Sequence, residues 1–568
     1  VRPARTSSME GEREYAFWHA LVRDVCYGQI PRLARAGRHE AAAAWLEEQA
    51  GERVEDLADV LAYHYESALE LARAARDDRI EELKARAVRY LSLAGARALT
   101  LDVDRAEQLL SRGLELCPDG DPQRALLLER WALAAHPQGR LQEAREAFEE
   151  ALELYRLEGE LVAAGRVLYR LVIVRFRLGD LAGSKEAVAE SIALLETQPP
   201  GPELVDAYAS AAGRATLQND PSEGIAAAER ALELAAELGL PEPSFALHWR
   251  GLARTNLGEV EGIDDLRRAL RLALEQNLGR ETSIVYGNLA AAVWFWQGTQ
   301  AALDVYADGL TYCERRGLAE VTLHMRAQIL FCRASLGDTE EAVREIGAIA
   351  DQVQANGDRA FIYFRGLQLR LLAERGTVGN TPDPDEPLAA ARELGELEVL
   401  VHAIANAARL RMVRGELAQA QALIRELDER TADDAGLSVD LSGLVRVLIA
   451  LGAPQLAERF IAPTEAAAGP PLDYHQLAAA KAQLAEARQE YEAAVALYGE
   501  AATRWQEFGD VPEHAYALLG QGRCLRALGD PVADQPLAEA RELFVSMGYK
   551  PALAETEGLL HQTQTAAS

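Results

Sequence analysis

The lysines are the first residues to examine for chemistry, because the commonest phosphate-binding loop depends on one. In that loop a lysine follows glycine and precedes serine or threonine, so that backbone amides and the ammonium group together hold the phosphates. The 568-residue chain has four lysines, and none follows a glycine: Lys84, Lys185, Lys481 and Lys550. We therefore expect no nucleotide or other cofactor to be bound by this chain.

The cysteines show no arrangement typical of a reactive or metal-binding group. They are scattered, odd in number and without a CxxC pair: Cys26, Cys117, Cys313, Cys332 and Cys524. Neither a disulfide framework nor a zinc site is indicated. This usage favours a reducing, cytoplasmic location.

Other catalytic motifs also need fixed spacings, and none is complete. A serine-hydrolase elbow, an HExxH zinc helix, an EF-hand loop and a GxGxxG turn are all missing. Gly520-Gln521-Gly522 lacks the third glycine and favours helix packing, while Asp383-Pro384-Asp385 is typical of a solvated turn rather than a metal site. The sequence predicts no catalytic residue and no metal, hence a binding protein; an enzyme with an unrecognised set of titratable groups is the remaining alternative.

The charge of the chain excludes two classes of partner. The formal net charge is -30, which repels nucleic-acid phosphates and anionic membrane surfaces. No run approaches 18 apolar residues, and the opening VRPARTSSMEGERE has no signal-peptide core. We expect neither nucleic acid nor a membrane as partner, and the oligomeric state is left open.

A repeat organises most of the chain. Turn residues recur about every 37 to 40 positions: Gly139, Gly179, Asn219, Gly258, Gly298, Gly337, Gly376, Gly415, Gly452 and Gly529, with Gln489-Glu490 at the one remaining turn. A second glycine series, from Gly159 to Gly548, falls midway between them. Glycine after an apolar periodic run is the expected left-handed end of a helix, so each repeat is predicted to be two antiparallel helices.

The segments between glycines carry helical apolar faces. Ala144, Phe148, Ala151 and Tyr155 form one such face, and a second begins at Tyr491 and includes Tyr498. A helix pair cannot bury such a face alone, but stacking on its neighbours gives a continuous core. The predicted fold is all-α, with about 11 to 12 helix pairs.

Small residues around Leu-Gly-Asp turns give the repeat a family likeness. Such turns stand at 178–180, 336–338 and 528–530, and Gly251 and Gly522 lie seven residues before a turn. The pattern resembles the tetratricopeptide (TPR) repeat, which implies a right-handed helical-repeat superhelix, or α-solenoid, with a concave groove. The period exceeds the usual 34 residues and is close to that of HEAT repeats, so a HEAT-like array is an open alternative.

The groove of a TPR array is lined by the first helix of each repeat, and positions can be counted back from each turn. The selected side chains are mixed aromatic, amide and cationic, as in recognition surfaces. The groove candidates are Tyr169, Arg177, His248, Asn256, Asn288, Trp296, His324, Tyr363, Arg370, His402 and Arg409. The alternative for any one aromatic residue is a role in filling gaps between helices.

The N-terminal segment carries different motifs, FWHALVRD, YGQIPR and LAYHY. They resemble the end of the ATPase module of bacterial STAND (AAA-type) regulators, especially those fused to adenylate or guanylate cyclase domains and ending in TPRs. The resemblance implies a winged-helix end and a linker. It also implies that His19 senses the phosphate of bound ADP, provided an ATPase domain is present; otherwise His19 is expected to be half-buried and to hold the segment together.

These observations predict four regions: a disordered tail at 1–14, the winged-helix end and linker at 15–75, the TPR-like array at 76–550, and a C-terminal cap and tail at 551–568. The predicted function is a non-enzymatic sensor region of a signal-transduction regulator, which binds a peptide, a protein or a small effector. A free-standing TPR assembly scaffold is the first alternative. The second is that the chain is part of a nucleotide cyclase or transcriptional regulator whose catalytic domain lies upstream.

Overall fold

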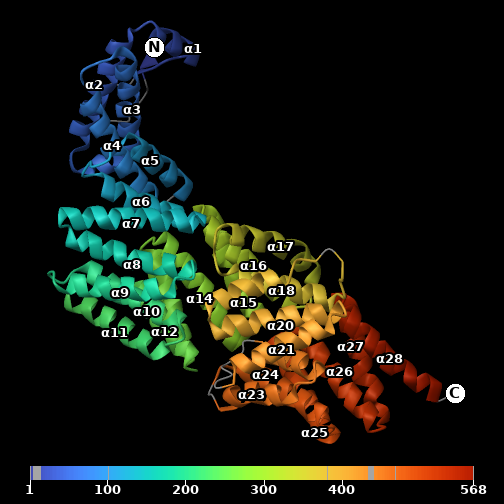
Figure 1. Ribbon diagram of the computed structural model, residues 1–568. Coiled ribbons are helices and arrows are strands. Elements are labelled where there is room, and N and C mark those ends of the chain that lie inside the picture. Colours follow the sequence, from blue (N-terminus) through green and yellow to red (C-terminus); the bar gives the residue numbers. More distant parts are fainter. Residues whose placement is uncertain are drawn as a thin grey trace. The chain divides into compact units, whose positions relative to one another are not determined.

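The computed structural model describes residues 2–3, 15–99, 102–379, 381–432, 440–466 and 469–566. It divides into two compact units, one of residues 1–135 and 147–154 and the other of residues 136–146 and 155–568. Within the described residues there are 28 α-helices and two short strands (Figure 1). Most of the predicted tail at 1–14 lies outside the described residues. The predicted boundaries at 75 and 550 stay predictions.

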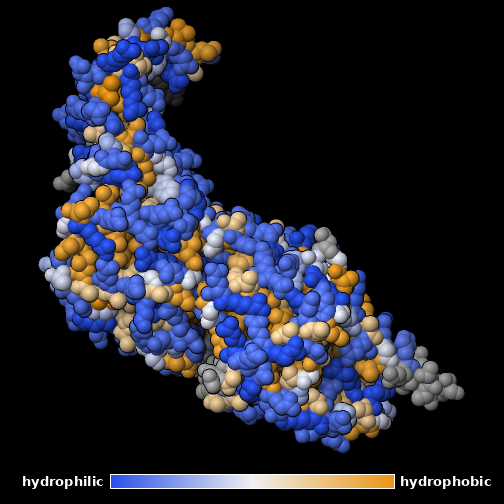
Figure 2. Space-filling model, viewed as in Figure 1, coloured by the Kyte–Doolittle hydropathy of each residue, from blue (hydrophilic) through white to orange (hydrophobic). Residues whose placement is uncertain are grey.

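The first unit begins with a two-residue antiparallel pairing of β1 (Arg2–Pro3) with β2 (Tyr15–Ala16). Its helices are α1 (Ala20–Gly28), α2 (Arg32–Ala50), a 3-10 turn (Gly51–Leu57), α3 (Ala58–Ala75), α4 (Ile80–Ala98), α5 (Val103–Leu116) and α6 (Arg124–Ala135). Helix α1 has no buried residue, and Figure 2 shows apolar surface near this end of the chain.

The second unit is a run of antiparallel helix pairs. After a 3-10 turn (His136–Gln138) come α7 (Leu141–Glu158, shared with the first unit), α8 (Leu161–Arg177), α9 (Leu181–Glu196), α10 (Pro202–Leu217), α11 (Pro221–Glu237), α12 (Ser244–Asn256), α13 (Gly262–Glu275), α14 (Gly279–Gln297) and α15 (Thr299–Arg316). The run continues with α16 (Ala319–Ser335), α17 (Thr339–Ala355), α18 (Phe361–Glu374), α19 (Asp385–Leu394), α20 (Leu397–Val413), α21 (Leu417–Arg430), α22 (Leu441–Ala450) and α23 (Pro454–Ala466). It ends with α24 (Pro471–Ala487), α25 (Tyr491–Phe508), α26 (Val511–Ala527), a 3-10 turn (Pro531–Ala533), α27 (Asp534–Met547) and α28 (Lys550–Ala566). This is the predicted TPR-like α-solenoid.

The turns end the helices as the glycine spacing predicts. Gly179 has φ 82°, in the left-handed region that glycine enters without a Cβ clash. Where glycine is missing, Asn219 (φ 61°) and Gln489 (φ 64°) take the same conformation. The helix pairs are therefore closed by a common backbone turn rather than by a common residue type.

Pro463 is a proline inside a helix. It is the tenth residue of α23. Because proline removes only one backbone hydrogen bond and α23 ends three residues later, the helix accommodates it near its C-terminal end.

The core is built from alanine and leucine with a few large aromatic rings. Phe148 and Tyr498, predicted to face the packing side of their helices, are 1% and 2% exposed. Small residues allow close helix contact: a Cβ placed on Gly251 would meet the carbonyl oxygen of Gly262 at 2.7 Å. The absence of a side chain at this position therefore lets the two paired helices pack closely.

Repeats far apart in sequence also touch within the second unit. The hydroxyl of Thr339 donates to the carbonyl of Met547 at 2.7 Å, and the amide of Arg359 donates to the carbonyl of Arg177 at 3.2 Å. A Cβ on Gly298 would lie 2.6 Å from the carbonyl oxygen of Phe508. The superhelix therefore curves tightly enough for α14 to α18 to meet α24 to α28, and the first helices of these pairs enclose a space.

Candidate ligand-binding cavity

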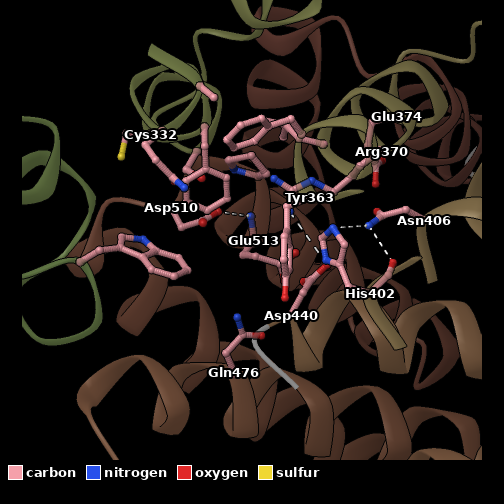
Figure 3. Close-up of a pocket in the computed structure, with 18 of the residues that line it drawn as sticks. Cys332, Tyr363, Arg370, Glu374, His402, Asn406, Asp440, Gln476, Asp510 and Glu513 are labelled. Carbon is pink, nitrogen blue, oxygen red and sulfur yellow. Dashed lines mark hydrogen bonds and ion pairs between the residues drawn. The ribbon is translucent and has the colours of Figure 1, made fainter. Parts of the chain in front are cut away.

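The enclosed space in the second unit is a cavity of about 410 Å³. Its wall comes mainly from the first helices of successive pairs, α14, α16, α18, α20, α22, α24 and α26, with Tyr306 from α15 and Tyr549 from the turn before α28. The volume lies in the range of pockets that bury small organic ligands. Figure 3 shows Asp510, Tyr363, His402 and Asp440 converging on it from different helices.

One part of the cavity wall is aromatic. Trp294 packs edge-on against Phe331, with 5.1 Å between ring centroids, and Phe295 lies next to Trp294 at 5.0 Å. Tyr363 contacts the ring of His402 at 5.1 Å. These rings offer broad apolar faces with little rotamer freedom to lose on binding.

A second part is a network of ion pairs. Arg446 donates to both carboxylate oxygens of Glu513, at 2.9 and 2.7 Å, and its guanidinium lies 3.8 Å from the ring centroid of Tyr516. The hydroxyl of Tyr516 donates to Glu374, which also lies 3.8 Å from Arg409. Paired and stacked in this way, the charged groups satisfy one another in a site largely removed from water.

Two aspartates reach the cavity because they cap helices. Asp440 accepts from the amide of Gly443 at 3.2 Å at the start of α22, and Asp510 accepts from the amide of Glu513 at 3.0 Å at the start of α26. Helix N-caps favour aspartate for this bond. Because α22 and α26 begin at the cavity, the capping carboxylates also line it.

The two capping carboxylates differ in their electrostatic surroundings. Asp440 has Arg409 at 3.6 Å and Arg370 at 3.9 Å; although burial opposes it, these arginines hold its pKa below the usual value. For Asp510, burial and the nearby Glu513 raise the pKa to about 7. Within the described part of the chain, no ion pair is formed by Asp510.

His402 is neutral at physiological pH. Burial lowers its pKa to about 4, and Asn406 lies at hydrogen-bond distance, 3.2 Å from Nε2. Cys332, at the opposite side of the wall, is also held in its neutral form because burial raises its thiol pKa to about 12. Neither side chain is placed in the charged state that a nucleophile or a proton relay at neutral pH would need.

Four of the eleven groove candidates line this cavity: Tyr363, Arg370, His402 and Arg409. All four lie on α18 and α20, at the middle of the predicted groove. On these two helices the backward count from the turns therefore selects residues that line the cavity, and their role in binding stays a prediction.

Three other candidates lie on α8 and α16 and do not line the cavity. The hydroxyl of Tyr169 donates to Asp206 at 3.1 Å. Arg177 and His324 both contact the buried carboxylate of Asp358, His324 at 3.2 Å. Arg177 and His324 therefore join α8 and α16 to the start of α18.

The remaining four candidates are also placed elsewhere. His248 is 0% exposed and bonds to Asn288 at 2.8 Å, so it packs between α12 and α14 and does not face a groove. Asn256 is exposed, and Trp296 is half-buried outside the cavity. On α14 the cavity is lined by Ala291, Trp294 and Phe295, so the count from the turn misses the lining residues there by one to three positions.

His19 is exposed at the start of α1, where its Nδ1 accepts from the amide of Leu21 at 3.2 Å. The expectation of a half-buried histidine that holds the segment together is wrong, since this bond is local. Its predicted role toward a nucleotide stays a prediction.

Several cavity residues were not selected from the sequence. Asp440 and Asp510 belong to inter-helix turns and Tyr549 precedes α28, whereas the count considered only first-helix positions. Arg446 and Tyr516 lie on first helices, but at turns of the superhelix beyond the counted region. An aspartate three residues before a glutamate predicts the N-terminal cap of a helix. This pattern does not show which of the capping residues line the cavity.

No group of three or more histidine, cysteine, aspartate or glutamate side chains in the described ranges is arranged to hold a metal ion. None of the helices placed by the structure combines the length and apolar character needed to span a bilayer.

Comparison with known proteins gives likenesses of structure only. No protein-family model matches the sequence, and no curated protein does. Among solved structures, the chain is similar to a Rap protein complexed with competence and sporulation factor, with 14% identity, a TM-score of 0.40, and coverage of 64% of this chain and 99% of the other. It is also similar to a signal-transduction ATPase (STAND) with a tetratricopeptide repeat sensor from Pyrococcus horikoshii, with 14% identity, a TM-score of 0.34, and coverage of 65% and 54%. A third likeness is to the APC/C hetero-tetramer Cut9–Hcn1, with 13% identity, a TM-score of 0.39, and coverage of 80% and 90%. These likenesses concern the helical-repeat fold.

Proposed function

We propose that this chain is a non-enzymatic ligand-binding region, and that its ligand occupies the cavity between α14 and α28. The proposal rests on the composition of the cavity wall, which contains aromatic rings, ion pairs and two helix-capping aspartates. These groups belong to repeats that come into contact only because the superhelix is curved. A ligand there contacts several repeats at once. Its binding would therefore stabilise the curvature in which those repeats touch.

Binding rather than catalysis is supported by the state of the polar groups. Arg446 pairs with Glu513, Glu374 accepts a hydrogen bond from Tyr516, and burial holds His402 and Cys332 neutral. Groups fixed in this way recognise a ligand by shape and charge without moving protons. A peptide segment, a protein terminus or a small effector is the class of ligand proposed.

We further propose that the chain works as the sensor region of a cytoplasmic signal-transduction regulator. This part of the proposal rests on the resemblance of the FWHALVRD, YGQIPR and LAYHY motifs to the end of a STAND ATPase module. Ligand binding in the second unit would bias a nucleotide switch connected through the N-terminal segment. The cavity favours a role as a sensor over a role as an assembly scaffold, because a scaffold needs only an open groove to bind its partners.

The test is a thermal-shift screen of the whole chain against a broad library of short peptides and metabolites, including cationic, anionic and neutral compounds. Ala291 lines the cavity from α14, so Ala291→Phe fills part of the space. The matched control is Ala226→Phe, which places the same ring at an exposed position of α11. We expect hits that stabilise the native chain and the control variant but bind Ala291→Phe at least tenfold more weakly. If no compound stabilises the chain, or if hits bind both variants equally, the cavity is not the binding site.

A further inference from the structure

We propose that the ligand carries an organic cation, a primary ammonium group on an aromatic or aliphatic body, and that this ammonium lies between Asp510 and the hydroxyl of Tyr549. The inference rests on the proposed function and specifies the chemistry of its ligand. It is carried by the balance of charge in the cavity wall, by unpartnered hydroxyl groups and by the aromatic faces.

The charge balance of the wall favours a cation. The inner wall holds four carboxylates and three guanidinium groups: Glu374, Asp440, Asp510 and Glu513 against Arg370, Arg409 and Arg446. Glu398 lies exposed at the rim and adds a fifth carboxylate. With Asp510 ionised and His402 neutral, the wall carries an excess of negative charge that one ammonium would offset.

Asp510 is the one of these four carboxylates that forms no ion pair among the described residues, and Arg370 acts on it only from beyond ion-pair distance. Glu513 has Arg446, Glu374 has Tyr516 and Arg409, and Asp440 has Arg370 and Arg409. Asp510 accepts only the capping amide of Glu513, and the carboxyl pKa is raised by burial to about 7. An ionised carboxylate in such a site is costly unless a cation approaches it. A bound ammonium would supply that partner.

Two tyrosine hydroxyls provide an independent observation. Tyr549 is 3% exposed and Tyr306 is 5% exposed, and both line the cavity. Among the described residues neither hydroxyl has a hydrogen-bond partner. Burial raises the pKa of the Tyr549 phenol, and the carboxylates of Glu374 and Asp510 add to this effect. A hydroxyl beside a carboxylate is a suitable acceptor pair for the three donors of an ammonium group.

The remaining wall suits the body of such a ligand. Trp294, Phe295 and Phe331 present aromatic faces to the same cavity, which attract a cation electrostatically and bury an attached apolar group. The net charge of -30 also raises the local concentration of cations around the whole protein.

The experiment is isothermal calorimetry of the whole chain with matched probes. Phenethylamine is compared with N-acetylphenethylamine, which lacks the charge, and with 3-phenylpropionate, which reverses it. A second arm compares the tripeptide amide Phe-Ala-Ala-NH2 with its N-acetylated form, so that a small amine and a peptide N-terminus are distinguished. We expect the free amine of one arm or both to bind at least tenfold more tightly than its acetylated analogue.

Asp510→Asn should remove this preference, lowering affinity for the amine at least tenfold, while asparagine retains the helix cap. The control is Asp220→Asn on α11, because Asp220 makes the same capping bond to Glu223, at 3.0 Å, at an exposed turn. Asp220→Asn should bind like the unchanged chain. Binding of acetylated or anionic probes in preference to amines, binding unaffected by Asp510→Asn, or no amine binding at millimolar concentration would each overturn the assignment. The proposed function would survive these results if the library screen returned a ligand sensitive to Ala291→Phe.

Discussion

Asp510 combines a structural and a recognition role in one carboxylate. As the N-cap of α26 it accepts a hydrogen bond from a backbone amide at 3.0 Å, and as part of the cavity wall it is partly buried and forms no ion pair among the described residues. Burial raises its carboxyl pKa to about 7, well above the usual value for an aspartate. The native chain therefore binds this proton more tightly than the unfolded chain does.

This shift predicts how stability depends on pH. Because the native state binds more protons here, the contribution of Asp510 to stability falls as pH rises from about 4 to about 7. Asp510→Asn keeps the cap but cannot ionise, so the variant should gain stability over the unchanged chain at pH 8 and lose that advantage near pH 4. Urea unfolding midpoints at both pH values measure this difference. A gain that is equal at both pH values would show that Asp510 is not held protonated.

Aromatic residues at the cavity and in the core should respond differently to truncation. Phe148 and Tyr498 are almost fully buried, so Phe148→Ala and Tyr498→Ala should each cost about 3 to 5 kcal/mol of stability. Tyr363 is half-buried at the cavity wall and Trp296 is half-buried outside it, so Tyr363→Ala and Trp296→Ala should cost less. Thermal melting separates the two classes. A larger loss in Tyr363→Ala than in Tyr498→Ala would reverse the assignment of these faces.

At the scale of the helix pair, glycine sets the distance between helices. Gly251 on α12 faces Gly262 on α13, and a Cβ on Gly251 would meet backbone atoms of α13 at 2.7 and 3.0 Å. Backbone cannot move aside as a flexible side chain can. The pair is therefore held at a spacing that only glycine permits.

Gly251→Ala should destabilise the chain by about 1 to 3 kcal/mol, since the added methyl forces α12 away from α13. Gly37 in α2 is the matched control, because a Cβ there meets nothing within 4 Å. Gly37→Ala should stabilise by roughly 0.5 to 1 kcal/mol through helix propensity. Equilibrium unfolding of the two variants compares them, and the close-packing argument fails if both changes have the same sign.

The sequence was most informative at the scale of the helix pair. Turn glycines such as Gly179 and Gly298 predict helix ends because a local backbone conformation requires them. Tyr363 and His402 could be placed in the groove because their helices repeat regularly between such turns. Asp510 could not be placed at the cavity from the sequence. It lines the cavity only because α26 lies opposite α14 and α16, and this arrangement depends on the rotations added by many successive repeats. His248 illustrates the opposite error. The count from the turns placed this polar residue in the groove, but a neighbouring helix buries it.

For the chain as a whole, the missing phosphate-binding loop leads to a prediction about nucleotides. Without a glycine-lysine-serine/threonine loop, and with a net charge of -30, the chain should not bind Mg-ATP or Mg-GTP. Calorimetry of the whole chain with each nucleotide measures this. Saturable binding at micromolar concentration would contradict the reading that any nucleotide switch lies outside this chain.

Contacts between distant repeats determine whether the second unit holds its curvature as one body. Thr339, at the start of α17, is 3% exposed and donates to the carbonyl of Met547 at the end of α27, 208 residues away. The same hydroxyl accepts from Arg375 at 3.3 Å. Thr339→Val removes both bonds and leaves a buried carbonyl without its partner, so it should cost about 1 to 3 kcal/mol.

The helices in which Thr339→Val loses stability distinguish a superhelix that is closed by this contact from repeats that open independently. If the contact joins the two ends of the cavity, Thr339→Val should increase amide hydrogen exchange both in α17 and in α27, although the two helices are far apart in sequence. Thr556→Val is the control, because the buried hydroxyl of Thr556 donates to Ala552 within its own helix, at 2.7 Å. Its effect should stay within the C-terminal helices. Faster exchange confined to α17 in Thr339→Val would mean that the repeats open separately, and a ligand in the cavity would then have no common curvature to stabilise.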